Sequence, residues 1–450
     1  MNRRILVWSL LVYQLLCIHV AADDLRVAVF TADATPVIGM PVAYVNARSI
    51  TDPLSARGIV LMGHDQPIVL CAVDWIGIGN GGHEEWRQVL AEAAGTTMDR
   101  VAVHTLHQHD GVRCDFTAED LLARYGLGGT RMDAGFCRRV ISSTAATVRE
   151  AIKTAKPVTH LGVGEAKVDK VASNRRILGP DGRVVFGRMS SSRDPRAKEA
   201  DEGTIDPVLK LVSFWNGDTP LACLTYYATH PQSFYGQGDV TAEFVGLARA
   251  ERETELRVPH IHFNGASGNV AAGKYNDGSP EARVQLTRRM ADGMKLAWES
   301  TQKIPITASE LDWRIERVTL PLAASLQREP LERDLADDQV DSRNRLNAAT
   351  KLALLYRAVA GYQFELSLLQ LGNVHVLHMP GELFVEYQLA AQQMKPDAIV
   401  CMAAYGDYSA GYIGTEIAYT QGGYEVQPSS SNTAPEVEQV LMDAMRRLLK

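Results

Sequence analysis

The chain has 450 residues, and 46% of them are hydrophobic, which is enough to build a sizeable core. The formal net charge is −7 and no long basic run occurs, which excludes nucleic acid as the main partner. Length alone allows two or three domains, or one large one.

The first residues have the pattern of an export signal. Two arginines precede an apolar run at residues 5–20, and two alanines precede Asp23. We therefore predict a signal peptide over residues 1–22, cleavage before Asp23 and an exported protein, either periplasmic or secreted. A single membrane anchor is the alternative, but the run is shorter than the ~20 apolar residues that a span needs.

Five cysteines remain after this cleavage, too few for a scaffold held together by disulfides, so the core must hold the fold. Export permits a disulfide, and Cys114 and Cys137, which flank a loop-rich segment, are the candidate pair. The other three lie in apolar runs and are expected to be buried free thiols, namely Cys71, Cys223 and Cys401.

Strand and helix patterns alternate in the first half of the chain. Apolar runs predict strands, and helical spacing predicts helices. The predicted strands are 24–30, 59–62, 67–73 and 101–103, and the predicted helices are 84–94 and 137–155. Residues 188–202 are charged and rich in serine, so we expect an exposed loop there. A hairpin is predicted over residues 207–227, with its turn at Asn216-Gly217-Asp218.

The second half mixes the same two patterns. Helices are predicted at 242–255, 282–300, 331–359, 385–394 and 435–449, and strands at 260–263, 306–321, 364–378 and 398–404. No internal repeat or clear linker interrupts them. We therefore predict the mixed α/β class, with a single large domain over residues 23–450 in which helices flank central β-sheets.

A buried strand that runs into histidines is predicted at residues 101–114, VAVHTLHQHDGVRC. His104, His107 and His109 fall within six positions, and Asp110 follows at once. Residues two apart on a strand point to the same face, so the rings of His107 and His109 could reach one ion or one substrate. Such a cluster favours a metal site over purely structural histidines.

Further candidate ligands follow apolar runs or lie in turns rich in glycine or proline. They are His230, Glu382, Tyr412 and Tyr424. Turns far apart in sequence can converge at one end of a sheet, and two imidazoles, a carboxylate and a phenolate would suit a zinc ion. Taken singly, His230 could end a strand, Glu382 could cap the helix that follows, and the tyrosines could pack in the core.

The ordered set of motifs resembles the catalytic domain of the neutral/alkaline, non-lysosomal ceramidase family of zinc amidases. The matching segments are HQHDGV at 107–112, NRR at 174–176, THP at 229–231, TAEFVG at 241–246, GE at 381–382, and the tyrosine segments at 412–419 and 422–425. The twelve-residue spacing between Tyr412 and Tyr424 is kept. The resemblance covers residues 25–450, and the family's C-terminal immunoglobulin-like domain is not expected here.

The resemblance implies a zinc-dependent amidohydrolase that cleaves an N-acyl, ceramide-like amide bond with metal-activated water. It implies a small-molecule or lipid amide as substrate, and peripheral contact with a membrane. The implied zinc ligands are His107, His230, Glu382 and Tyr412. His109 would be the acid/base group or would stabilise the transition state, Arg175 and Tyr424 would contact the substrate, and a tyrosine hydroxyl such as that of Tyr424 could stabilise the oxyanion. His104 lies outside the matching segment and is expected to lie outside the site.

The sequence also departs from the family pattern. Ala271 stands where the family has a serine, Asp110 replaces another serine, and Val112-Arg113 replaces a Pro-Gly pair. Three alternatives therefore stay open. The first is an exported, non-catalytic protein that binds a metal or ligand on the same fold, and the second is a zinc hydrolase for non-lipid amides or esters. The third is a metallo-β-lactamase-like site, although the acid after His109 lies at the wrong spacing for that motif.

Overall fold

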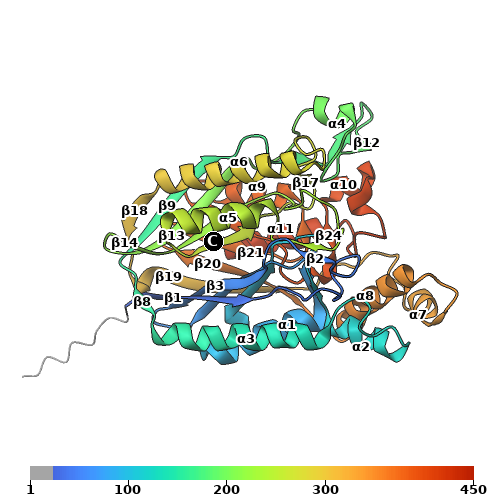
Figure 1. Cartoon of the computed structure of the whole chain (residues 1–450), viewed down its shortest axis with the longest axis horizontal. Coiled ribbons are helices and arrows are strands. Elements are labelled where there is room, and N and C mark those ends of the chain that lie inside the picture. The colour runs from blue at the N-terminus through green and yellow to red at the C-terminus, as the bar shows by residue number, and fades with distance from the viewer. Residues whose placement is uncertain (1–23) are drawn as a thin grey trace, which may run out of the picture.

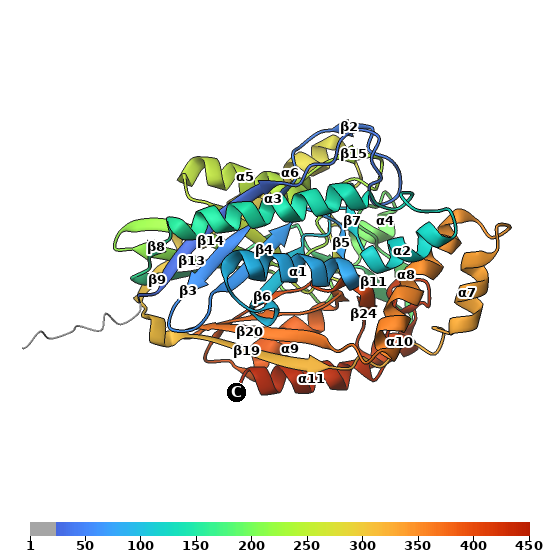
Figure 2. The same ribbon diagram turned by 90° about the horizontal axis from the view of Figure 1, so that it is seen from below.

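The computed structural model describes residues 24–450, so the predicted signal peptide at 1–22 lies outside the described residues. Within residues 24–450, none of the helices combines the length and apolar character that crossing a bilayer requires. The described chain forms three larger β-sheets with helices packed on their outer faces (Figures 1 and 2).

The first sheet has the strand order β6-β4-β3-β1-β8. Its strands are β1 (Arg26–Asp33), β3 (Ser55–Met62), β4 (Ile68–Val73), β6 (Val101–Thr105) and β8 (Lys156–Pro157). The helices α1 (Asn80–Ala94) and α3 (Ala134–Lys153) cover one face, as Figure 2 shows. Every residue of β4 is buried because the sheet is covered on both faces. β4 and β6 pair in parallel, with α1 as the crossover.

The second sheet has the strand order β16-β14-β13-β9-β18. Its strands are β9 (His160–Lys167), β13 (Val208–Asn216), β14 (Thr219–Tyr227), β16 (His260–Asn264) and β18 (Gln302–Pro305). The helices α5 (Glu243–Leu256) and α6 (Pro280–Glu299) lie over its outer face at the top of Figure 1. β14 and β16 pair in parallel, with α5 between them in the chain.

The third sheet has the strand order β19-β20-β21-β23. Its strands are β19 (Leu311–Val318), β20 (Phe364–Leu371), β21 (Val374–His378) and β23 (Ile399–Ala403). The helices α9 (Val385–Met394) and α11 (Val437–Leu448) pack against it. β21 and β23 pair in parallel, again with a helix, α9, as the crossover.

The three sheets share one apolar core, to which each contributes fully buried side chains such as Leu70, Leu211 and Val376. This confirms the prediction of a mixed α/β architecture with central sheets flanked by helices. Each sheet contains one parallel β-helix-β unit, and the ends of these units are tied together. Thr105 N donates to Tyr405 O at 3.0 Å, and Ala404 N donates to Asn264 O at 2.9 Å. Three strand-to-loop junctions therefore meet at one place.

Shorter elements complete the chain. Two-residue ladders pair β2 (Ser49–Ile50) with β15 (Asp239–Val240), β5 (Gly77–Ile78) with β7 (Arg113–Cys114), β10 (Ser173–Asn174) with β17 (Val270–Ala271), and β22 (Glu382–Leu383) with β24 (Tyr412–Ile413). β11 (Arg176–Leu178) and β12 (Val184–Gly187) form a small hairpin, and α4 (Pro195–Glu199) and α10 (Glu416–Gln421) are short helices. At one end of the molecule α2 (Phe116–Arg124), α7 (Arg328–Ala336) and α8 (Ser342–Val359) form a helical lobe (Figure 1).

Three local predictions differ from the structure. The single helix predicted over residues 331–359 is two helices, α7 and α8, and helix α2 was not predicted at all. Arg188 is buried rather than part of an exposed loop, because its guanidinium donates to the carbonyls of Asn174, Ala197, Ala200, Asp201 and Glu202. All five described cysteines are buried free thiols, so Cys114 and Cys137 do not form the candidate disulfide.

A buried ion pair fixes the end of β4 and gives a prediction about stability. Asp74 accepts hydrogen bonds from Arg249 at 2.8 and 2.7 Å and from the backbone and hydroxyl of Ser55 at 2.9 and 2.7 Å. Asp74→Asn leaves the guanidinium without its counter-ion, and we expect it to lower the free energy of unfolding by about 3–5 kcal/mol at pH 7. Urea unfolding checks this, with the exposed Asp443→Asn as control, for which about 1 kcal/mol or less is expected.

The same pair predicts how the effect of Asp74→Asn depends on pH. Burial alone would raise the pKa of Asp74, but Arg249 outweighs burial and the pKa is lowered from its usual value. The stabilisation is therefore present above the unfolded-state pKa of about 3.9 and is lost as the pH falls through the lower folded-state pKa. If the difference in free energy of unfolding between wild type and Asp74→Asn stayed constant as the pH fell to this range, the assignment of Asp74 as a charged partner of Arg249 would be wrong.

Candidate active site

The predicted ligands meet where the three parallel units end. His107 and His109 follow β6, His230 follows β14, and Glu382 begins β22 shortly after β21. β22 pairs in parallel with β24, which sets Glu382 directly opposite Tyr412. The structure thus brings together all four ligands that the resemblance implies.

The two histidines after β6 are not on the strand, which ends at Thr105. His107 lies in the left-handed backbone region with φ 68°, a conformation that costs a non-glycine residue free energy and is kept only where the surroundings impose it. The prediction that His107 and His109 share one strand face is therefore wrong in its geometry. Their rings still converge, because the turn directs both toward the same point.

Three of the separations between the donor atoms match those in a tetrahedral zinc site. Glu382 Oε2 lies 3.3 Å from His107 Nε2 and 3.2 Å from His230 Nε2, and Tyr412 OH lies 3.4 Å from His230 Nε2. Zinc–ligand bonds of about 2.0–2.1 Å in a tetrahedron place neighbouring donors about 3.3 Å apart. These three separations therefore suit such an ion.

Backbone carbonyls hold the two imidazoles with Nε2 facing the centre. His107 Nδ1 lies 2.7 Å from Ile76 O, and His230 Nδ1 lies 2.7 Å from Ser267 O. A carbonyl can only accept, so both Nδ1 atoms carry protons and both Nε2 atoms present lone pairs. Two such lone pairs and the Glu382 carboxylate facing one another are all acceptors, which is the donor set of a cation site.

The carboxylate of Glu382 is held in its charged form. Burial alone would raise its pKa, but positive charge on His107 and His230 outweighs burial and lowers the pKa well below the usual range. A cation bound between the two neutral rings would supply the same charge. Its second oxygen, Oε1, accepts a hydrogen bond from Tyr408 OH at 2.7 Å. Gly381 allows the chain to approach here, since it has φ +60° and a Cβ at this position would lie 2.7 Å from Gly411 O.

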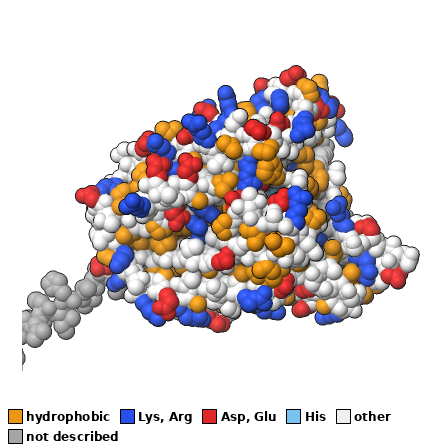
Figure 3. All heavy atoms as spheres, viewed as in Figure 1, with side chains coloured by type: hydrophobic (Ala, Val, Ile, Leu, Met, Phe, Trp, Pro, Cys, Tyr) orange, Lys and Arg blue, Asp and Glu red, His pale blue; other side chains and the backbone are white. Residues whose placement is uncertain are grey.

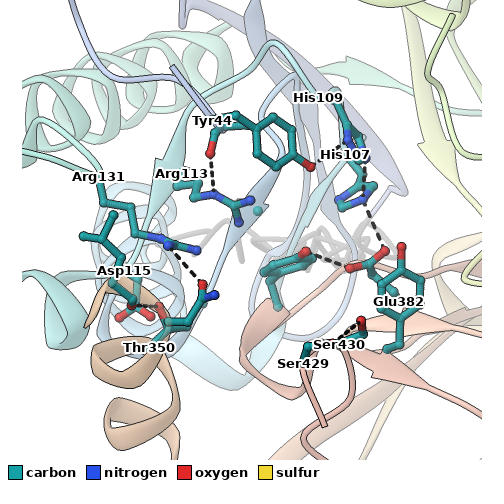
Figure 4. A pocket seen from close by; sticks show the side chains of 18 of the residues that line it. Tyr44, His107, His109, Arg113, Asp115, Arg131, Thr350, Glu382, Ser429 and Ser430 are labelled. Carbon is teal, nitrogen blue, oxygen red and sulfur yellow. Dashed lines mark hydrogen bonds and ion pairs between the residues drawn. The ribbon is translucent and has the colours of Figure 1, made fainter. Parts of the chain in front are cut away.

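His109 lies beside the ligands and has a second partner. Its Nε2 is 3.1 Å from His107 Nε2, and its Nδ1 is 2.9 Å from Tyr44 OH (Figure 4). Ligand nitrogens of His107, His109 and His230 all lie within 4.8 Å of one another. Burial, and next the neighbouring His107 and His230, lower the pKa of His109 well below its usual value, so the ring is neutral and can accept a proton.

Arg175 and Tyr424 both lie against Tyr412, one of the implied ligands. Arg175 donates to Tyr412 OH at 3.0 Å, and its guanidinium carbon lies 5.6 Å from the Tyr412 ring centre and 5.7 Å from that of Tyr424. Glu425 forms an ion pair with Arg175 at 3.2 Å. Tyr424 keeps 46% of its surface exposed, so its hydroxyl is available to a bound molecule.

A cavity of about 890 Å³ opens onto this cluster. Most of the predicted site residues line it, namely His107, His109, Arg175, Glu382, Tyr412 and Tyr424. Tyr44, Tyr408, Arg113 and Arg131 also line it. Sequence reasoning assigned no role to any of these four. Two of them could have been suspected from the sequence. Tyr408 lies just before the tyrosine segments that begin at Tyr412, and Arg113 belongs to the pair that replaces the family's Pro-Gly. No sequence feature pointed to Tyr44 or Arg131.

Three residues singled out in the sequence lie elsewhere. His104 turns away from the cluster, with its Nδ1 2.7 Å from Ala404 O. Asp110 accepts from Gly238 N at 2.7 Å and so ties down a neighbouring loop instead of contacting His109. Ala271 is buried in β17 opposite Ser173 and is not among the residues lining the cavity, so the missing serine removes no group from its wall.

Comparison with solved structures agrees with this architecture, whereas comparison by sequence finds no relative. No family model matches the sequence, and no curated protein matches it. Among solved structures, a ceramidase complexed with C2 aligns with a TM-score of 0.69 and 15% identity, over 95% of this chain and 75% of the other. The neutral ceramidase from Pseudomonas aeruginosa aligns with a TM-score of 0.68 and 16% identity, with the same coverage. This chain therefore has the fold of the neutral ceramidases.

Proposed function

We propose that this protein is a zinc-dependent amidohydrolase that cleaves an N-acyl, ceramide-like amide bond. The observation that carries the proposal is the set of donor separations of 3.2–3.4 Å among His230, Glu382, His107 and Tyr412, with neutral His109 beside them in a large cavity. The likeness to two ceramidases supports the fold on which this chemistry would take place.

Zinc held by His107, His230, Glu382 and Tyr412 would need a fifth, open position, where it would acidify a bound water and polarise the amide carbonyl. His109 is the group placed to move protons. Its Nε2 faces the cluster, where it can accept a proton from the attacking water and then deliver it to the leaving nitrogen. Tyr44, through its hydrogen bond to Nδ1, orients this ring. Tyr424 lines the same cavity next to Tyr412, so its hydroxyl can donate to the developing oxyanion.

Zinc content measured together with a substrate panel tests the proposal. The panel contains ceramides, simpler N-acyl amines and esters of equal chain length. We expect the protein to bind zinc and to hydrolyse the amides of the panel faster than the esters. Bound zinc without turnover of any amide or ester would favour a non-catalytic binding protein, and turnover of esters or short non-lipid amides alone would favour a different zinc hydrolase. A purified protein with no affinity for zinc would overturn the ligand assignment.

Location and membrane contact stay part of the proposal. Cleavage before Asp23 would be seen by N-terminal sequencing of the protein recovered outside the cytoplasm. Peripheral membrane contact is supported by three exposed apolar side chains, Val37, Ile38 and Val45, in the segment that carries Tyr44 at the cavity. Sedimentation with phosphatidylcholine vesicles checks this contact.

A further inference from the structure

The cavity extends beyond the histidine cluster to two arginines. Arg113 and Arg131 both line it, and Figure 4 shows Arg113 between the histidines and Arg131. Within residues 24–450, neither guanidinium has a carboxylate oxygen within 4.0 Å. On the face in Figure 3, by contrast, positive and negative side chains are interspersed.

The hydrogen bonds that the two guanidinium groups do make are long. Arg113 Nε donates to Ala43 O at 3.4 Å, and Arg131 donates to Asn347 Oδ1 at 3.5 Å. A guanidinium has five N–H donors, and bonds of this length are weak. Most of the donor capacity of this pair therefore remains available to a bound molecule.

Other enclosed arginines of this protein are paired with acids or, in the case of Arg188, with five backbone carbonyls. Arg249 lies 2.7 Å from Asp74, and Arg357 lies 3.1 Å from Asp407. The acid on the cavity wall beside Arg131 is Asp115, which already accepts from Ala118 N at 2.9 Å and from Asn80 at 2.7 Å as the cap of α2. Two guanidiniums lining one cavity without such a partner thus form an exception that a bound anion would explain.

The two arginines differ in their electrostatics. Burial would lower the pKa of Arg113, but Tyr408 and Tyr44 outweigh burial and raise it. Burial, and next the charge of Arg113, lower the pKa of Arg131 to about 9. Two like charges in a partly desolvated cavity repel, and an anion between them relieves the repulsion. Arg is suited to this task because its planar fork binds a carboxylate through two hydrogen bonds.

The position of Arg113 indicates where the anion lies relative to the reacting bond. Its guanidinium carbon is 5.8 Å from the Tyr44 ring centre and 6.0 Å from that of Tyr408. These two tyrosines contact His109 and Glu382 directly. Arg113 is thus one side chain away from the proposed catalytic centre, and an anion bound to it would lie a few bonds from the scissile amide.

We infer that Arg113 and Arg131 bind an anionic oxyacid group of the substrate, so that this enzyme prefers N-acyl conjugates of amino acids, or of similar acidic amines, over neutral ceramides. The inference rests on the proposed amidohydrolase function for its kinetic consequence. The anion site itself does not depend on hydrolysis, and the two can be tested separately.

The kinetic test compares N-lauroyl-glycine with N-lauroyl-ethanolamine, which have the same acyl chain and differ in charge. We expect kcat/KM for the anionic substrate to be about tenfold higher or more, the size of a charge-assisted hydrogen bond. Arg131→Met, which keeps an unbranched apolar stem and removes the guanidinium, should reduce this ratio by about tenfold, and Arg131→Lys should retain part of it. Arg124→Gln, an exposed change at the end of α2, is the control and should leave the ratio as it is. N-lauroyl-taurine distinguishes a carboxylate from a sulfonate.

A binding test separates the anion site from the hydrolase proposal. Calorimetry with the non-hydrolysable dodecylsulfonyl analogues of glycine and ethanolamine should show tighter binding of the anion, and this preference should fall with Arg131→Met. Anion preference without hydrolysis of any amide would sink the proposed function and leave the anion site standing. Equal binding of the two analogues, or a preference that neither Arg131→Met nor Arg131→Lys changes, would overturn the inference. Thermal melting confirms that both variants are folded.

Discussion

Replacing His107 or His230 by alanine is expected to remove bound zinc and hydrolysis together. Each ring presents its Nε2 to the cluster and is held by a backbone carbonyl at 2.7 Å, so the loss of either removes a pre-oriented donor. Zinc content should fall from about one ion per chain to a small fraction of that, and amide hydrolysis to the level of buffer. Elemental analysis after dialysis and a hydrolysis assay on the same sample measure both.

The matched control is His104→Ala. His104 is also a buried histidine at the end of β6, but its Nδ1 lies against Ala404 O and its ring packs on Phe263 and His378. We expect this variant to lose stability while it keeps its zinc. Zinc retained by both His107→Ala and His230→Ala, or lost equally from His104→Ala, would contradict the ligand assignment.

His109→Ala is expected to keep the metal and to lose kcat by about 10²- to 10⁴-fold, the range of general acid–base catalysis. The physical reason is that Glu382, His107, His230 and Tyr412 supply four donors, with three separations of 3.2–3.4 Å that suit zinc, while His109 has Tyr44 as its second partner. Steady-state kinetics and zinc content of the purified variant measure the two effects.

The alternative role of His109 is a zinc ligand, since its nitrogen belongs to the group of three imidazoles within 4.8 Å. Loss of zinc from His109→Ala would establish that role and refute the one assigned here. Tyr44→Phe adds a second comparison, because it removes only the hydrogen bond to Nδ1. A smaller loss of kcat than for His109→Ala, with zinc retained, is expected if Tyr44 positions the ring.

The sequence by itself predicted most of the local elements and, through its resemblance to a family, the proposed ligands. Helix α9 was predicted at residues 385–394 and the structure has it at Val385–Met394, because apolar spacing and the flanking turns act over short distances. The buried strand β4 was equally readable from its apolar run. The ordered motifs named His107, His109, His230, Glu382 and Tyr412 before any geometry was known.

Only the tertiary structure decided how those residues meet. His230 and Glu382 are 152 positions apart, and their 3.2 Å contact depends on which strands end side by side. The left-handed backbone of His107 and the pairing of β22 with β24 are likewise imposed by neighbours distant in sequence. Tyr44, Arg113 and Arg131 had no assigned role for the same reason. A pattern along the chain indicates which side chains are buried. A site depends on which strand ends the fold brings side by side, and that is decided by contacts between segments distant in sequence.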